Sequence, residues 1–209
     1  MKALIFDIDG TIWDCRAIST RGYNRAMDEF GRPDLYVTPD YLATLFGRTG
    51  EEIAGIVFAD YPPEQRMALF NRVLELEDAE LKNDPCQVDF PGVRETLRAL
   101  HRDHRLFVVS NCDCGYPELM MEKLGLQDIF EGHMCHGDTL LPKDDTILAL
   151  MARYGITDAV YIGDTQGDLV ASRKAGIPFI CCGYGFGDPA EWDARIEDFR
   201  QLPEALKTI

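Results

Sequence analysis

Two aspartates, Asp7 and Asp9, follow directly on the apolar run of residues 3–6, and Gly10 and Thr11 come next. Side chains at positions i and i+2 of a strand point to the same face, so the two carboxylates are expected to lie close together and to repel each other. A chain tolerates this loss of stability where a cation or a reaction needs both groups. The pair therefore marks a candidate site for chemistry.

Other polar side chains stand where further apolar runs end. Ser110 and Asn111 end one run, Asp164 and Asp168 follow another, and Lys143 precedes the helix that leads into that second run. Acidic residues at such places also serve as helix caps and turn formers, which would be a sufficient explanation for Asp164 alone. The whole set, with several ionisable groups expected at one edge of a sheet, favours a functional cluster.

The residue types limit the chemistry of this cluster. Several carboxylates, with no suitable set of histidines and cysteines beside them, are ligands that suit Mg²⁺. The ion would neutralise the repulsion between Asp7 and Asp9 and allow a phosphate to approach. Lys143 would add a positive charge for phosphoryl oxygens, and Ser110 would add a neutral donor. The pattern therefore predicts a magnesium-dependent reaction at a phosphate group.

The elements that must position these groups alternate between strand and helix. Strands are expected at residues 3–8, 106–110, 132–135, 159–162 and 178–182, and helices at 93–103, 117–124, 144–154 and 166–175. Short strands with few charges are typical of a parallel sheet covered on both faces. The pattern predicts a doubly wound, Rossmann-like α/β fold, in which ligands bind beyond the carboxyl ends of the strands.

One segment interrupts the alternation. Residues 15–84 are expected to be helical throughout, with helix starts indicated by Thr38 before a proline and by Thr49 paired with Glu52. The sequence therefore predicts an α/β core of residues 1–14 and 85–209 with an inserted helical domain at 15–84.

Composition narrows the class of protein. The 209 residues carry a net charge of −15, which argues against binding to nucleic acid. The N-terminal apolar run is too short for a signal peptide, and no stretch approaches the length of a membrane span, so no membrane partner is expected. Seven cysteines in scattered positions favour reduced thiols and a cytoplasmic location. The oligomeric state is left open.

The chain resembles the haloacid dehalogenase superfamily, and within it the phosphatases similar to phosphoglycolate phosphatase. The resemblance covers residues 1–14 and 85–209, and four motifs carry it: Asp7-Ile8-Asp9-Gly10-Thr11, Ser110 after Phe107-Val108-Val109, Lys143, and Gly163-Asp164-Thr165-Gln166-Gly167-Asp168. Asp144 follows Lys143 where a proline is common. The inserted segment resembles the helical, C1-type cap of that family by its position.

The resemblance implies a role for each motif residue. Asp7 would be the nucleophile that takes the phosphoryl group, and Asp9 would be the general acid and then the general base. Asp7, the main-chain carbonyl of Asp9, and Asp164 would hold Mg²⁺, with Asp168 in support. The second aspartate argues against dehalogenation, because a halide leaves without a proton.

The remaining implied roles concern the substrate, a small phosphorylated metabolite. Thr11, Ser110, Asn111 and Lys143 would hold the phosphoryl oxygens. Arg48 lies in a loop at residues 46–50 that the resemblance expects to close over the substrate, although a helix–helix turn with a solvated arginine is the alternative.

Two other functions remain compatible with these residues. A phosphomutase of the same superfamily would share the core motifs and differ in its cap. A receiver-like protein would be phosphorylated on an aspartate and would bind a partner without turnover, but Asp9 and the inserted helical domain argue against it. The identity of the phosphorylated substrate is left open.

Three further patterns in the sequence are weaker. Cys112, Cys114 and Cys135 have nearby histidines at 133 and 136, but C-x-C is not a usual zinc spacing, so the pattern favours small thiols over a zinc site. The glycine-rich residues 183–187 follow the last expected strand without the spacing of a nucleotide-binding loop. Trp13 either lines the substrate pocket or packs in the core.

Overall fold

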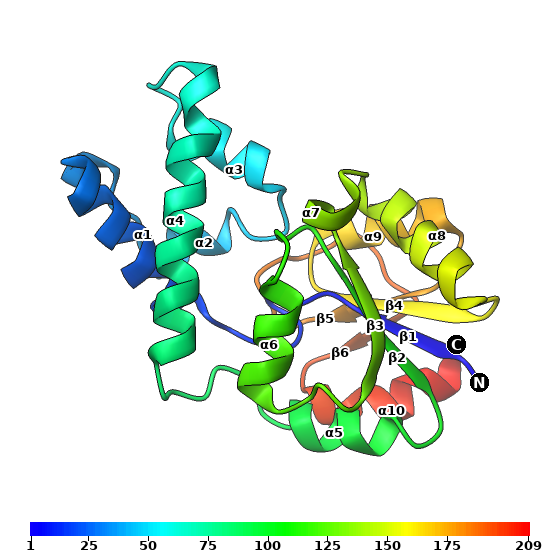
Figure 1. Cartoon of the computed structure of the whole chain (residues 1–209). Coiled ribbons are helices and arrows are strands. Elements are labelled where there is room, and N and C mark those ends of the chain that lie inside the picture. The colour runs from blue at the N-terminus through cyan, green and yellow to red at the C-terminus, as the bar shows by residue number, and fades with distance from the viewer. The chain divides into compact units, whose positions relative to one another are not determined.

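The structure, a computed structural model, describes residues 1–209 and divides into two compact units. One unit consists of Met1–Asp14 and Val88–Ile209, and the other of Cys15–Gln87. The sequence predicts the end of the insertion at residue 84, before the extended segment that leads back to the first unit. Figure 1 shows the strands gathered in the first unit and only helices and turns in the second.

The first unit is built on a six-stranded parallel sheet with the order β3-β2-β1-β4-β5-β6. Its strands are β1 Ala3–Phe6, β2 Arg105–Ser110, β3 Phe130–Cys135, β4 Ala159–Gly163, β5 Phe179–Cys182 and β6 Ala194–Ile196. The chain moves outward from β1 to one side and from β4 to the other. This order makes the crevice beyond β1 and β4 the switch point where such folds bind ligands.

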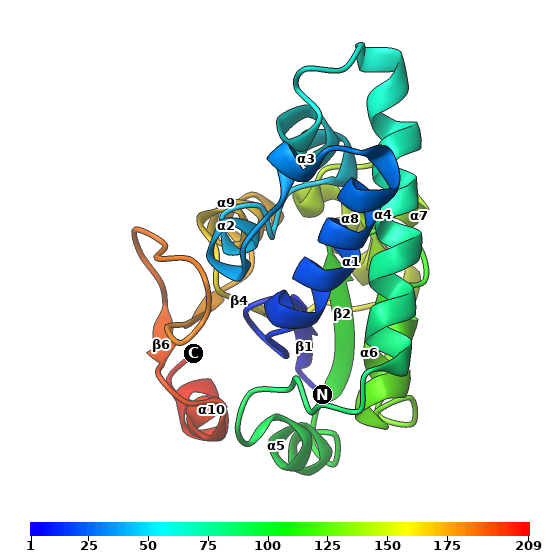
Figure 2. The ribbon, with the colours of Figure 1, turned by 90° about the vertical axis from the view of Figure 1, so that its left-hand side faces the viewer.

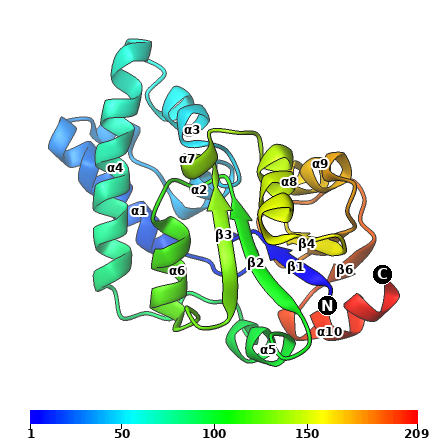
Figure 3. The same cartoon turned by 45° about the vertical axis from the view of Figure 1, so that its right-hand side comes forward.

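Helices cover both faces of the sheet, as Figures 1 and 3 show. They are α5 Val93–Leu100, α6 Tyr116–Leu124, α7 His136–Thr139, α8 Lys143–Tyr154, α9 Gln166–Ala175 and α10 Leu202–Ala205. Helices α8 and α9 pack on one face, where Ile147 and Leu169 join Ile5, Phe107 and Tyr161 in a buried cluster. Strands buried on both faces explain the near-continuous apolar runs in the sequence.

The predicted α/β fold is confirmed, and the differences concern element ends and one strand. Helices α6, α8 and α9 end at glycines in the left-handed conformation, as their sequences predict. The prediction that the strand at 178–182 is the last one is wrong, because β6 follows and pairs with β5. Three residues, Ala194–Ile196, are too few to show a strand period in a sequence.

The second unit contains four α-helices around its own core. They are α1 Arg16–Phe30, α2 Pro39–Ala43, α3 Gly50–Val57 and α4 Pro63–Asn83. Thr49 and Glu52 form the predicted capping box, and Thr38 caps α2 by accepting a bond from Tyr41 N–H. The core joins Tyr23 to Phe58, Phe70 and Val73, which come from three segments distant in sequence.

Figure 2 marks both chain ends in the first unit, and Lys2 Nζ donates to the main-chain oxygen of Ile209 at 2.9 Å. None of the helices combines the length and the apolar character needed to cross a membrane.

Candidate active site

Three carboxylates converge at the carboxyl ends of β1 and β4. Phe6 pairs with Ile162 in the sheet, so Asp7 and Asp164 follow neighbouring strand ends, and Asp168 comes from the first turn of α9. Each offers one oxygen, and the three oxygens all lie within 4.8 Å of one another. All three side chains are buried, at 2% exposure for Asp7 and 0% for the other two. Ionised carboxylates that lie this close together and are excluded from water destabilise the protein unless a cation compensates their charge.

Lys143 supplies one positive charge to this cluster. Its Nζ lies 3.1 Å from Asp7 Oδ1 and 2.6 Å from Asp168 Oδ1. It is buried at the start of α8, and Nζ lies 5.7 Å from the centre of the Tyr161 ring. One ammonium faces three carboxylates, so the cluster keeps an excess of negative charge if all three are ionised.

The charges in this cluster shift the pKa values of its carboxylates and of Lys143. Burial raises the pKa of the Asp7 carboxyl to about 7; Lys143 opposes this shift, while Asp168 and Asp9 add to it. Burial, Asp168 and Asp7 raise the pKa of Asp164 well above its usual range. Burial alone would lower the pKa of Lys143, but Asp168 and Asp7 outweigh it and raise this pKa. The lysine therefore stays charged, and a further cation would be needed to keep both Asp7 and Asp164 ionised near neutral pH.

Asp164 is oriented by a loop that follows β5. Its Oδ2 accepts hydrogen bonds from Phe186 N–H at 2.7 Å and Gly187 N–H at 3.3 Å, and its Oδ1 accepts a long one from Thr11 Oγ1 at 3.4 Å. Gly10, at φ +78°, lies against the same carboxylate, and a Cβ at this position would collide with it. The glycine-rich residues 183–187 thus belong to the site, as a support for Asp164.

Asp168 is fixed by the cap of α9. Its Oδ2 accepts hydrogen bonds from Asp164 N–H at 3.2 Å, Thr165 N–H at 2.9 Å and Thr165 Oγ1 at 2.8 Å. Its Oδ1 faces Lys143. Both oxygens therefore hold parts of the site in place, and the supporting role of Asp168 at a metal ion stays a prediction.

Asp9 points to two hydrogen-bond donors. Its Oδ1 accepts from Trp13 Nε1 at 2.8 Å and from Tyr116 Oη at 2.9 Å, and the two aromatic rings meet edge to face at 5.4 Å. Trp13 is fully buried and belongs to the core as well as to the site. Tyr116 is not among the predicted site residues, because it stands 107 positions from Asp9 and has no motif around it.

The other predicted residues lie in three places. Phe6 pairs with Val108, so the buried Ser110 ends the strand next to the one that Asp7 follows, and Asn111 comes directly after it. Thr11 is fully buried and its hydroxyl faces Asp164. Arg48 belongs to the helical unit, is exposed, and donates from Nε to the Thr44 carbonyl at 3.4 Å.

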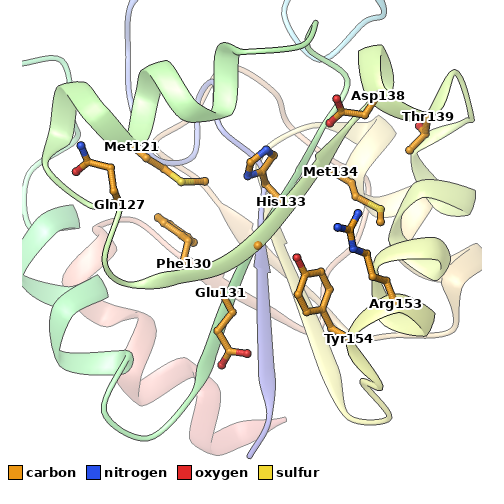
Figure 4. Close-up of a pocket in the computed structure, with 11 residues that line it drawn as sticks. Met121, Gln127, Phe130, Glu131, His133, Met134, Asp138, Thr139, Arg153 and Tyr154 are labelled. Carbon is orange, nitrogen blue, oxygen red and sulfur yellow. The ribbon is translucent and has the colours of Figure 1, made fainter.

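A pocket of about 650 Å³ lies elsewhere, along the edge strand β3 between α6 and α8. Figure 4 shows His133, Asp138, Arg153 and Tyr154 around it. None of the predicted catalytic residues lines this pocket, so its size does not bear on the chemistry at Asp7.

Tyr116 gives the first testable prediction. Tyr116→Phe removes one of the two donors that orient Asp9, and a hydrogen bond to a charged group contributes about 1.5–3 kcal/mol. We expect kcat/KM for an alkyl phosphate to fall roughly tenfold or more, with a smaller loss for p-nitrophenyl phosphate, whose leaving group needs no proton. Tyr154→Phe, a matched change at the end of α8, should leave both values unchanged. Equal losses for the two substrates would show that Tyr116 acts on something other than Asp9.

Comparison with known proteins shows the family of the chain. A family model described as haloacid dehalogenase-like hydrolase matches residues 4–182. A phosphoglycolate phosphatase of Agrobacterium fabrum is 30% identical over 216 residues, covering 97% of this chain and 91% of that protein. One from Xanthomonas campestris is 29% identical over 205 residues, covering 93% and 90%.

A solved structure supports the fold. A protein from Haemophilus somnus, described as a predicted phosphoglycolate phosphatase, has a TM-score of 0.86 with 20% identity and covers 99% of this chain and 98% of its own. The predicted resemblance and the predicted phosphatase activity on a small phosphorylated substrate are confirmed by these matches. The chain belongs to the haloacid dehalogenase-like hydrolases and is a phosphatase of that family.

Proposed function

We propose that this phosphatase hydrolyses a small phosphate monoester through a phosphoryl group carried on Asp7, with Mg²⁺ as its metal ion. The observation that carries the proposal is the buried group of Asp7, Asp164, Asp168 and Lys143 beyond β1 and β4. It joins a carboxylate that can act as a nucleophile to a buried ammonium group that suits phosphoryl oxygens.

The donor set fits a hard divalent cation. Its three acidic side chains offer only oxygen, and the raised pKa values of Asp7 and Asp164 indicate that the cluster needs more positive charge than Lys143 provides. Asp7, Asp164 and the Asp9 carbonyl would hold the ion, with Asp168 in support. When bound, Mg²⁺ would neutralise the carboxylates and withdraw negative charge from the phosphoryl oxygens.

In the first step, a carboxylate oxygen of Asp7 attacks phosphorus, and the bond from phosphorus to the substrate oxygen breaks. Asp9 gives its proton to that departing oxygen, and Trp13 and Tyr116 hold the carboxyl in place. Lys143, Ser110 and Asn111 bind the phosphoryl oxygens and stabilise their charge during transfer.

In the second step, the Asp9 carboxylate takes a proton from water while the water oxygen attacks phosphorus. The bond between phosphorus and Asp7 breaks, inorganic phosphate is released, and Asp9 is again protonated for the next turnover. Two easier steps thus replace one difficult hydrolysis.

The first substrate to test is 2-phosphoglycolate, because the two relatives above are phosphoglycolate phosphatases. Purified protein with Mg²⁺ should release inorganic phosphate from one small phosphate ester with a kcat/KM well above that for p-nitrophenyl phosphate. A panel of phosphorylated acids and sugars identifies the ester. Conversion of a sugar phosphate into an isomer, without phosphate release, would instead show a phosphomutase.

The second prediction links the metal to pH. The usual pKa of an aspartate, which applies to the unfolded chain, is 3.8, and in the fold the pKa of Asp7 is about 7. Between these two pH values the metal-free folded state therefore binds more protons than the unfolded state. The stability of the metal-free protein falls as pH rises through that window. Mg²⁺ must displace this proton at low pH but not above pH 7. We expect Mg²⁺ to raise Tm more at about pH 8 than at about pH 5. Asp7→Asn should reduce the shift at the higher pH, and an equal shift at both pH values would contradict this account.

The third prediction concerns Arg48, whose role in substrate binding stays a prediction from the sequence. Arg48→Ala should raise KM about tenfold for a substrate with a second anionic group, such as 2-phosphoglycolate, and leave small aryl phosphates nearly unchanged. Arg25→Ala, an exposed arginine of the same unit, serves as the matched control. A similar rise in KM for both substrate types would assign Arg48 to the structure of the helical unit.

A further inference from the structure

A second group of metal-binding side chains lies beyond the carboxyl ends of β2 and β3. Cys114, Cys135 and Asp138 each offer one ligand atom, and these atoms all lie within 4.8 Å of one another. Cys135 is buried at the end of β3, whereas Cys114 and Asp138 are exposed. All of these thiols are free of disulfide bonds.

The carboxylate of Asp138 hydrogen-bonds to both thiols. Its Oδ2 accepts hydrogen bonds from Cys135 Sγ at 3.2 Å and from Cys135 N–H at 3.3 Å, and Cys114 also hydrogen-bonds to this carboxylate. A third thiol is adjacent, because Cys112 hydrogen-bonds to Cys135. The donors therefore surround one point from two loops, although C-x-C spacing alone gave no reason to expect this.

The main chain holds the two loops in this arrangement. Gly137 N–H, just after β3, donates to the Cys112 carbonyl at 3.1 Å. A Cβ at Gly137 would lie 2.5 Å from the Cys114 nitrogen, so only glycine lets the loops approach this closely. The thiols thus meet because of fixed backbone contacts as well as flexible side chains. The pocket along β3 is lined by Asp138 (Figure 4), which gives the carboxylate an open approach.

We propose that Cys114, Cys135 and Asp138 form a binding site for a thiophilic divalent cation of the zinc class, separate from the carboxylate cluster at Asp7. Two thiolates and a carboxylate are zinc ligands and poor magnesium ligands. In a tetrahedral site with Zn–S about 2.3 Å and Zn–O about 2.0–2.2 Å, ligand atoms lie roughly 3.5–4 Å apart, so the three atoms need to close by about 1 Å at most.

Binding is balanced by proton release. The cation replaces the two thiol protons that now face Asp138, and these protons pass to solvent. The fourth position is taken by water, or by Cys112 with the release of a third thiol proton to solvent. Since Cys112 follows Ser110 and Asn111 on the same loop, an ion here would tie the β3 loop to the loop that binds phosphate.

The test uses Co²⁺ as a spectroscopic probe on the full chain. Protein freed of metal, kept reduced and saturated with Mg²⁺, should bind one equivalent of Co²⁺ with the charge-transfer absorption of thiolate ligands, and Zn²⁺ should abolish this absorption. Cys114→Ser, at an exposed position, should remove most of the absorption and weaken Zn²⁺ binding about tenfold or more. Asp138→Asn should weaken it in the same direction.

Two controls separate this site from others. Cys86→Ser, an exposed cysteine in the helical unit, should leave the absorption unchanged. Asp7→Asn should also leave it unchanged, because the carboxylate cluster does not take part. Absence of thiolate absorption in the wild-type protein, or its full retention in Cys114→Ser and Asp138→Asn, would overturn the proposal.

Discussion

Asp7→Asn is expected to lose phosphatase activity to background, roughly 10⁴-fold or more, while the protein stays folded. The amide is a poor nucleophile and a poor metal ligand, so both the phosphoryl transfer and the binding of the cation fail. Steady-state kinetics with the best substrate from the panel measures the loss. Activity clearly above background in a homogeneous, folded variant would rule out Asp7 as the nucleophile.

The electrostatics of the site indicate that Asp7→Asn does not destabilise the metal-free protein. Burial raises the pKa of Asp7 to about 7 in spite of Lys143, so the site favours a neutral side chain when no further cation is present. Lys143 keeps its contact with Asp168 at 2.6 Å. The metal-free variant should therefore have a Tm at about pH 8 equal to or above that of the metal-free wild type. Asp145→Asn, at an exposed position on α8, is the matched control and should keep full activity.

Asp9→Asn is expected to show a loss that depends on the leaving group. An alkyl alcohol leaves badly without a proton, so the first step should slow by roughly 10²–10⁴ for an alkyl phosphate. A nitrophenolate leaves well without one, so the same step should slow much less for p-nitrophenyl phosphate. The main-chain carbonyl of residue 9 is unchanged, and metal binding should survive. Single-turnover kinetics with both substrates measures the difference.

The hydrogen bonds that position the side chain of residue 9 should survive in the Asp9→Asn variant. Trp13 and Tyr116 both donate to Asp9 Oδ1, and an asparagine oxygen can accept the same two hydrogen bonds. The geometry should therefore persist while the acid is lost. Equal slowing for the two leaving groups would mean that Asp9 serves the metal site and not proton transfer.

Much of the core could be predicted because its information is local. Apolar runs, glycine stops and strand-end polar residues each occupy a few consecutive positions, and the parallel sheet brings the strand ends to one edge. Asp7, Asp164, Asp168 and Lys143 meet for that reason. The capping box at Thr49 is local in the same sense.

The features that were missed depend on contacts between distant segments. Tyr116 reaches Asp9 only through the packing of α6, and the amides of residues 186 and 187 reach Asp164 only because the loop after β5 folds back. Strand β6 is three residues long and is defined by its partner β5. The thiols of Cys114 and Cys135 meet because of a close backbone approach at Gly137, which no residue spacing encodes.

The most direct test of the covalent mechanism uses the Asp9→Asn variant with p-nitrophenyl phosphate. Asp9→Asn should complete the first step with p-nitrophenyl phosphate but lack the base for the second, so the phosphorylated protein should accumulate. Acid quench within one turnover, digestion and mass spectrometry should locate one added phosphoryl group on Asp7 in the N-terminal peptide. A covalent mechanism through Asp7 requires this adduct together with a burst of nitrophenolate of matching amount. A burst without any phosphoryl group on the protein, or a phosphoryl group on another residue, would contradict it.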